Sequence, residues 1–301
     1  MSELMAYADD LRIRGFADST IYNYTRMLKL VEFELPGTRR DVKAWLSMRG
    51  RTVSIATLCF DLRALKSYSA WWAEESGQDD PLAAMPFPKQ RTPPPGRIAD
   101  EDDVHAVLRE LRQWRSHPNN IRDYAIVATL RYTGMRRSEL TRLNVDDIDF
   151  DAKRITIAAG KNGEGRIVPL HAEAGRAIRR YLTSVRDTHR HSDLAQLWLG
   201  RDGALRADSI NKIFNRVSAL AELDHPLTPH QFRRLLAKTW AVEGGSDDLL
   251  MLIAGWRSFT MVARYRAEAG VELANLQYDK IFEDKNPPRK YKLKRGRPSA
   301  A

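Results

Sequence analysis

The sequence predicts a mainly α-helical protein built from two domains, with one small β-hairpin or sheet in the second domain. Apolar residues recur at helical spacing through most of the 301 residues. A proline-rich segment divides the chain, and only one stretch combines β-branched residues with a glycine-rich turn. A chain of this length can bury two separate cores.

The first 76 residues predict four helices, which we expect to form one domain over residues 1–80. Gly15 and Gly77 end the first and the last of these helices. Residues that commonly cap a helix mark the other three starts: Asp18 or Ser19, then Thr38, then Thr52.

A linker is expected over residues 81–98, because six prolines and a glycine occur between Pro81 and Gly96. Proline fixes φ and removes a backbone donor, so such a segment favours extended geometry over a helix. Asp100 can cap the first helix of the second domain, which we place at residues 99–284. Residues 285–301 form a basic tail.

The second domain carries the strand signal. Two β-favouring runs, Arg154–Ala158 and Arg166–Leu170, flank a glycine-rich turn and predict a hairpin with Lys161 at its tip. The segments that follow are expected to be helices, at about residues 172–187, 207–222, 229–243, 247–254, 259–268 and 271–283.

The net charge of +10 is unevenly distributed. Residues 1–90 carry 12 basic and 12 acidic residues, whereas residues 285–301 carry seven basic and no acidic residues. Charge therefore indicates a nucleic-acid partner mainly through the tail. The single cysteine, Cys59, excludes a disulfide framework, and no apolar run is long enough to span a membrane. We expect a cytoplasmic protein without a membrane partner.

Four kinds of side chain supply what is needed to break a DNA phosphodiester without a metal. Arg136 and Arg233 can each bind two phosphate oxygens through a planar guanidinium group. Tyr265 is a nucleophile that can hold the phosphoryl group covalently, so that the bond energy is kept for resealing. His230 can accept or relay a proton, and the indole N–H of Trp256 can donate to a phosphate oxygen.

Local spacing supports this grouping. His230 and Arg233 are three positions apart, so both face the same side of one predicted helix. Thr228-Pro229 places them in its first turn, where free N–H groups also favour an anion. Glu139 follows Arg136 by three positions and can orient its side chain.

The motifs that contain these residues resemble the tyrosine recombinases, the lambda-integrase family, and the resemblance covers nearly the whole chain. They are Thr133-Gly134-Met135-Arg136-Arg137-Ser138-Glu139-Leu140, His230-Gln231-Phe232-Arg233 and Gly255-Trp256-Arg257-Ser258, with Tyr265 nine positions after Trp256. The chain departs from the family in three ways. Arg234 stands where relatives often have histidine, Trp256 stands where many have histidine, and the hairpin lacks a second lysine.

The resemblance implies a mechanism. Tyr265 attacks the scissile phosphate, which Arg136, Arg233, His230 and Trp256 hold, while Glu139 has a supporting role. Lys161 protonates the departing 5′ oxygen and a 3′-phosphotyrosine remains. Strand exchange then passes through a Holliday junction, with no metal or other cofactor.

The resemblance also implies domain roles and partners. Residues 1–80 correspond to a core-binding, SAM-like DNA-binding domain and residues 99–284 to the catalytic domain. Four protomers on synapsed double-stranded DNA would form the active complex, with a segment near 271–283 docking on a neighbour. An accessory DNA-bending or directionality factor is a further partner that the resemblance allows. Such an enzyme is expected at the nucleoid.

The tail is expected to touch DNA through Lys292, Lys294, Arg295 and Arg297. The run Arg295-Gly296-Arg297-Pro298 matches the core of an AT-hook, in which extended arginines lie in a narrow A·T minor groove. The alternative is a generic basic tail that binds phosphates electrostatically.

Several functions are compatible with these patterns. Because the first predicted helix begins almost at Met1, the chain resembles an arm-less phage or mobile-element integrase, or an Xer-type chromosome or plasmid resolvase. The Gly255-Trp256 motif and the basic tail favour the integrase. An inactive recombinase fold acting as a DNA-binding or architectural protein would have no need of Tyr265. The four-helix N-terminal domain favours a recombinase over a type IB topoisomerase.

Overall fold

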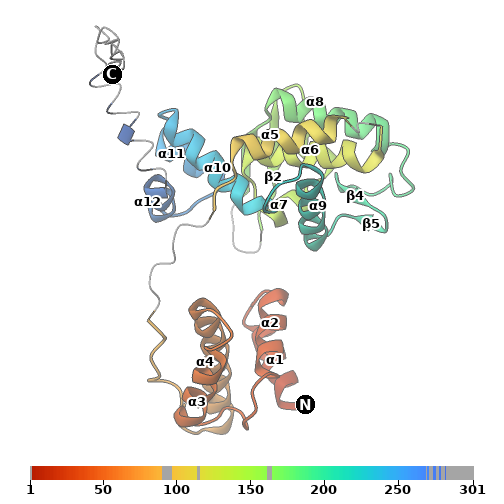
Figure 1. The fold of residues 1–301 in the computed structure, drawn as a ribbon. Helices are drawn as coiled ribbons and strands as arrows, with labels where there is room; N and C mark the ends of the chain where they lie inside the picture. The colour runs from red at the N-terminus through yellow and green to blue at the C-terminus, as the bar shows by residue number, and fades with distance from the viewer. Residues whose placement is uncertain are drawn as a thin grey trace, which may run out of the picture. The chain divides into compact units, whose positions relative to one another are not determined.

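A computed structural model describes residues 2–89, 97–113, 116–160, 165–268, 270, 274–275, 278 and 282, without the side chains of Ser2, Arg264, Tyr265 and Glu268. The chain divides into two compact units, Met1–Gly96 and Arg97–Ala301, which we call unit 1 and unit 2 (Figure 1). Each unit has a hydrophobic core of its own.

Unit 1 contains four helices, as the sequence predicts: α1 (Ser2–Ile13), α2 (Asp18–Leu28), α3 (Arg39–Arg49) and α4 (Ile55–Ser76). Helices α2 and α3 pack against α4, and α1 packs against α2. The rings of Tyr7 and Tyr68 meet edge to face, with their centroids 5.2 Å apart. Leu82 and Met85 are buried in the same core, so the start of the proline-rich segment forms part of the core of unit 1.

The helix starts in unit 1 differ from two of the predictions. Thr38 caps α3 as expected, since its hydroxyl accepts a hydrogen bond from the backbone N–H of Asp41 at 3.2 Å. Helix α4 is capped by Ser54 rather than Thr52, because Thr52 still belongs to the turn that follows α3. Asp18 is the first residue of α2 and not its cap.

Unit 2 holds most of the secondary structure (Figure 1). Its elements, in chain order, are α5 (Glu101–Gln113), α6 (Pro118–Thr133), α7 (Arg137–Arg142), η1 (Val145–Asp147), β1 (Ile148–Asp149), β2 (Arg154–Ile157), β3 (Arg166–Pro169), α8 (Ala172–Tyr181), η2 (Leu182–Arg186), β4 (Leu199–Gly200), β5 (Gly203–Ala204), α9 (Ala207–Leu220), α10 (Pro229–Val242), α11 (Asp247–Ala254) and α12 (Phe259–Glu268).

Helix α6 is the centre of unit 2 and packs against α5, α8 and α10. The middle of the helix is buried on every side, since the residues from Ala125 to Ala128 are all completely buried. Pro118 opens the helix, and Gly134, with a φ of +53°, ends it. The described part of the chain has no helix that combines the length and hydropathy needed to cross a membrane.

The predicted hairpin forms, with β2 and β3 paired antiparallel and Ile155 opposite Val168. Strand β1, which the sequence analysis missed, adds to the other edge of β2. Ile155, Ile157 and Val168 face the core in the alternation expected of a sheet with one buried face. The prediction of a mostly helical fold with a small sheet in the second domain is therefore confirmed.

Two other details of unit 2 differ from the predictions. The helix expected at 172–187 is α-helical only as far as Tyr181 and then widens into the π-helical turn η2. Strands β4 and β5 were missed because two residues per strand are too few to show an alternating pattern.

Unit 1 should depend on the buried side of α4. Replacing Leu65, which is fully buried, with alanine should lower the free energy of unfolding by about 2–5 kcal/mol, because it leaves a cavity. Leu30→Ala is the matched control, since the Leu30 side chain is 49% exposed, and should change stability by no more than about 0.5 kcal/mol. Urea unfolding measures both, and equal losses would contradict the placement of the core.

Candidate active site

A cleft of about 830 Å³ in unit 2 brings together residues from α7, the β2–β3 hairpin, α10 and α11. Of the predicted site residues, Arg136, Glu139, His230, Arg233 and Trp256 line it. The described lining contains one carboxylate and five arginines, namely Arg136, Arg142, Arg166, Arg233 and Arg257. This surplus of positive charge suits a polyanionic ligand such as DNA.

The C-terminal turn of α11 binds three of these arginines through consecutive backbone carbonyls. Arg166 donates from Nε to the carbonyl of Ile253 at 2.8 Å, and Arg233 donates to that of Ala254. Arg136 donates from Nη2 to the carbonyl of Gly255 at 3.0 Å. The last carbonyls of a helix lack partners within the helix and carry the negative end of its dipole, so cations are favoured there.

Gly255 is required at the end of α11 for two reasons. Its φ is +62°, a left-handed conformation that a residue with a Cβ atom adopts only at a cost. A Cβ atom there would also lie 2.9 Å from Nη1 of Arg166. The glycine therefore lets the chain turn towards Trp256 and lets the Arg166 guanidinium approach the backbone.

Arg233 is almost completely buried, with 4% of its surface exposed. Its Nη1 donates to the carbonyl of Gly134 at 3.1 Å, at the turn between α6 and α7. The guanidinium carbon lies 5.0 Å from the centre of the Trp256 ring, within range of a cation–π interaction. These contacts hold a cation rigidly at the floor of the cleft.

Glu139 binds two arginines at once. Its carboxylate accepts hydrogen bonds from Nη1 and the backbone N–H of Arg136, at 2.6 and 2.7 Å, and from Nη1 and Nη2 of Arg166, at 2.9 and 2.8 Å. Burial by itself would raise the pKa of Glu139, but the hydrogen bonds and charges of Arg166 and Arg136 outweigh it and lower the pKa to about 2. Glu139 is therefore a carboxylate throughout the physiological pH range.

His230 lies in the first turn of α10, directly after Pro229. Thr228 caps this helix, and its backbone N–H donates to the side chain of Gln231 at 2.7 Å, which stabilises the first turn. His230 is exposed and lines the cleft together with Arg233, which is one turn further along the same helix. The predicted sharing of one helix face is therefore seen in the structure.

Trp256 combines packing with a place at the cleft. It is buried and belongs to a small apolar cluster with Leu250, Ala254 and Val262. It also lines the cleft below Arg233. One side chain therefore both packs in an apolar cluster and lines the cleft.

Tyr265 lies in α12, and its side chain is outside the described residues, as are Lys161 and the tail residues Lys292, Lys294, Arg295 and Arg297. Helix α12 packs against α10 and α11, and an ion pair of 2.8 Å joins Arg266 to Asp247 at the start of α11. Gly160 and Gly165, which flank the hairpin tip in the sequence, line the cleft.

Arg166 and Arg142 were missed by the sequence analysis as site residues. Arg142 is an exposed arginine that donates to the carbonyl of Ser138 at 3.0 Å, and nothing in its sequence context distinguishes it. Arg166 had a usable signal. It is two positions before Val168 in the predicted strand, so the period of two places an arginine on the buried face. A charge on such a face requires a partner.

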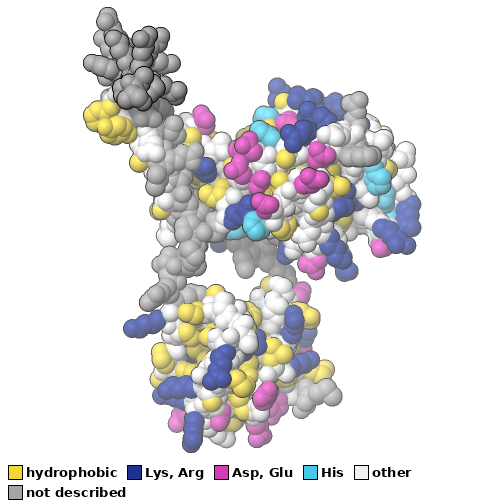
Figure 2. Space-filling view, in the orientation of Figure 1, with side chains coloured by type: hydrophobic (Ala, Val, Ile, Leu, Met, Phe, Trp, Pro, Cys, Tyr) yellow, Lys and Arg dark blue, Asp and Glu magenta, His cyan; other side chains and the backbone are white. Residues whose placement is uncertain are grey.

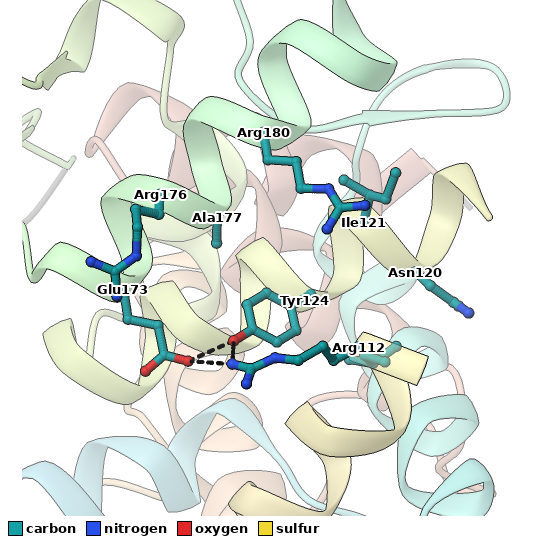
Figure 3. Close-up of a pocket in the computed structure, with 9 residues that line it drawn as sticks. Arg112, Asn120, Ile121, Tyr124, Glu173, Arg176, Ala177 and Arg180 are labelled. Carbon is teal, nitrogen blue, oxygen red and sulfur yellow. Dashed lines mark hydrogen bonds and ion pairs between the residues drawn. The ribbon is translucent and has the colours of Figure 1, made fainter. Parts of the chain in front are cut away.

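A second pocket, of about 330 Å³, lies between α5, α6 and α8 and shares no residue with the cleft (Figure 3). Tyr124 donates to Glu173 at 2.6 Å and accepts from Arg112 at 2.6 Å, so this carboxylate is already compensated. Figure 2 shows basic side chains gathered over α8, where Arg176 and Arg180 are exposed at the edge of this pocket.

The Phage integrase family matches residues 97–270 of the chain. The tyrosine recombinase XerC of Corynebacterium glutamicum is 30% identical over 240 residues, which cover 78% of this chain and 74% of that protein. A structure of the Tn1549 transposon integrase with transposon right end DNA has a TM-score of 0.69 at 21% identity, covering 93% of this chain and 99% of that one. A lambda integrase tetramer bound to a Holliday junction has a TM-score of 0.69 at 18% identity, covering 89% and 77%.

The chain belongs to the phage integrase family. It is a tyrosine recombinase of the Xer and integrase type, so the family and the enzyme class predicted from the sequence are confirmed. The catalytic roles of individual residues stay predictions.

The stability of unit 2 should depend on pH through Glu139. Its pKa is depressed from the usual 4.5 to about 2, so its contribution is complete above pH 4.5 and is lost as the pH falls towards 2. Over that range the free energy of unfolding of the wild type should fall by about 3 kcal/mol more than that of Glu139→Gln. Urea unfolding at a series of pH values measures the difference, and parallel curves would contradict the assignment.

Gly255→Ala should slow DNA cleavage more than its loss of folding stability explains. Gly244→Ala is the matched control, because Gly244 has a φ of +75° and no atom within 4 Å of an added Cβ. Both substitutions should cost about 1 kcal/mol of stability, but only Gly255→Ala displaces Arg166 and slows DNA cleavage. Equal cleavage rates for the two variants would contradict the role given to this turn.

Proposed function

We propose that this tyrosine recombinase cleaves and rejoins duplex DNA at the cleft of unit 2 through a 3′-phosphotyrosine at Tyr265. The observation that carries the proposal is the fixing of Arg136, Arg166 and Arg233 on consecutive carbonyls of α11. His230 and Trp256 line the same cleft, and α12, which contains Tyr265, packs against α10 and α11.

Arg136 and Arg233 bind and neutralise the scissile phosphate in this proposal. The Arg136 side chain is 49% exposed and lines the cleft, and its bonds to Glu139 and Gly255 fix its orientation. Arg233 supplies a second, buried cation. Because both are held before DNA arrives, they stabilise the charge that develops during transfer without reorganising, which is the largest catalytic effect expected at such a site.

Proton transfer completes each step. The Tyr265 oxygen forms a bond to phosphorus as its proton passes to His230 or through it to water. The bond from phosphorus to the 5′ oxygen breaks, and Lys161 gives that oxygen a proton. Attack by a 5′ hydroxyl on the phosphotyrosine reverses these transfers and reseals the strand, so no outside source of energy is consumed.

The two units have separate tasks in this proposal. Residues 1–80 act as the core-binding domain and residues 99–284 as the catalytic domain. Four protomers act on two duplexes, as supported by the lambda integrase tetramer on a Holliday junction. Lys292, Lys294, Arg295 and Arg297 of the tail add contacts to DNA, which their positive charge favours.

Within the recombinases we propose an integrase of a phage or mobile element. Its support is the Gly255-Trp256 motif together with the basic tail. The likeness to XerC favours a second candidate, an Xer-type resolvase of chromosomes or plasmids. The two differ in the reaction that predominates: joining of two unlike sites on separate molecules, or exchange between like sites on one molecule.

Covalent trapping tests the cleavage step. Nicked suicide duplexes drawn from the DNA flanking the gene should give a covalent adduct with the wild type and none with Tyr265→Phe, because the phenyl ring has no nucleophilic oxygen. Tyr278→Phe is the control and should form the adduct at the wild-type rate, since Tyr278 is an exposed tyrosine outside the proposed site. An adduct formed by Tyr265→Phe would overturn the assignment.

The same assay tests the arginines and the biological role. Arg136→Ala should slow adduct formation by a factor of about 10²–10³, because a preorganised donor to the phosphate is lost. Once a cleaved site is known, reporter plasmids with unlike sites on two molecules, or like sites on one, separate the two candidates. Preferred exchange between like sites would replace the integrase with the resolvase.

A further inference from the structure

We propose that Arg166 is a positioning residue of the recombination reaction, which orients Glu139 and, through it, the phosphate-binding Arg136. This role rests on the proposed function of the cleft. Arg166 acts from β3, at the base of the hairpin, and it makes no use of its charge to bind DNA directly.

The Arg166 side chain is largely buried, and each of its three guanidinium nitrogens donates to a protein acceptor. Its side chain is 10% exposed. Nη1 and Nη2 donate to the two oxygens of Glu139 at 2.9 and 2.8 Å, and Nε donates to the carbonyl of Ile253 at 2.8 Å. Such a paired contact fixes the plane of a carboxylate, which a single ammonium group cannot do.

Arg136 shares this carboxylate but occupies the opposite kind of environment. Its side chain is 49% exposed at the cleft, and its Nη1 meets the Glu139 oxygen Oε1, the same oxygen that Arg166 Nη1 binds. Glu139 therefore lies between a buried arginine that holds it and an exposed arginine that it holds. A small rotation of the carboxylate would move the Arg136 donors away from the phosphate.

Arg166 also joins elements that are distant in the sequence. Its contacts connect β3 with α7, through Glu139, and with the last turn of α11, through Ile253. Gly255 leaves room for its guanidinium group. The bond to Ile253 fixes the Arg166 side chain itself, on the turn whose next two carbonyls bind Arg233 and Arg136.

The charges around Glu139 explain why losing Arg166 should be seen in a pH profile. The charged and titratable groups that line the cleft with it are Arg136 and Arg142 next to and in α7, Arg166 in β3, His230 and Arg233 in α10, and Arg257 after α11. Only Arg166 and Arg136 bond to the Glu139 carboxylate among the described contacts. Without Arg166, only Arg136 opposes the effect of burial, so the pKa of Glu139 should be higher than in the wild type.

The test is single-turnover cleavage of a suicide duplex, with DNA saturating, from about pH 5 to pH 9. Arg166→Gln should cleave on the order of 10-fold to 100-fold more slowly than the wild type, while its Kd for the duplex changes less than about 2-fold. Its rate should also fall towards acidic pH more steeply than that of the wild type, as Glu139 takes up a proton. Arg166→Lys should show the same defects to a smaller degree.

A matched control separates positioning from stability. Arg131 has a side chain that is 15% exposed and forms an ion pair of 2.6 Å with Glu101, outside the cleft. Arg131→Gln therefore also removes a largely buried ion pair, and it should leave the rate and the pH profile of cleavage unchanged in its folded fraction. A rate loss of the same size in Arg131→Gln would overturn the positioning role.

A double mutant gives the final comparison. If Arg166 acts through Glu139, then Glu139→Gln combined with Arg166→Gln should cleave no more slowly than Glu139→Gln alone. The inference would be overturned if the double variant cleaved more slowly than Glu139→Gln, with the two rate losses multiplied. It would also be overturned if Arg166→Gln had the rate and pH profile of the wild type. In both cases the wild type would still form the Tyr265 adduct. Absence of that adduct would overturn the proposed function itself.

Discussion

The C-terminal turn of α11 is the constraint on which the site depends. A helix ends with carbonyls that have no partners, and here three of them accept guanidinium groups from β3, α10 and the start of α7. Negative partial charge at a helix end offsets the mutual repulsion of clustered cations before any phosphate is present. The helix terminus therefore offsets part of the positive charge of the arginines in the unliganded protein, as phosphate groups would when DNA is bound.

The single carboxylate of the described cleft lining complements this arrangement. Burying Glu139 would be unfavourable alone, but four hydrogen bonds from Arg136 and Arg166 keep it ionised. In the roles we propose, the two arginines differ because their exposure differs. Arg166 is 10% exposed and would orient Glu139, whereas Arg136 is 49% exposed and would bind a phosphate in the cleft.

Much of the fold and five of the residues that line the cleft could be predicted, because the deciding interactions are local. His230 and Arg233 share a face because helical geometry places positions three apart together, and Pro229 marks the first turn. The spacing of the apolar residues and the positions of the turn residues predict the four helices of unit 1 and the hairpin of unit 2. The strands β4 and β5 were missed because two residues are too few to show an alternating pattern. The cap of α4 was missed because Thr52 and Ser54 both satisfy the same local rule.

The sequence by itself determined the family, the helical fold class and the residue types of the site, because periodicity, caps and motif spacing act over a few residues. Only the tertiary structure decided which groups touch. Glu139 and Arg166 are 27 positions apart, and Arg136 reaches a carbonyl 119 positions away. Such contacts depend on how α7, β3 and α11 pack on the core around α6, and no local pattern records the burial that makes them favourable.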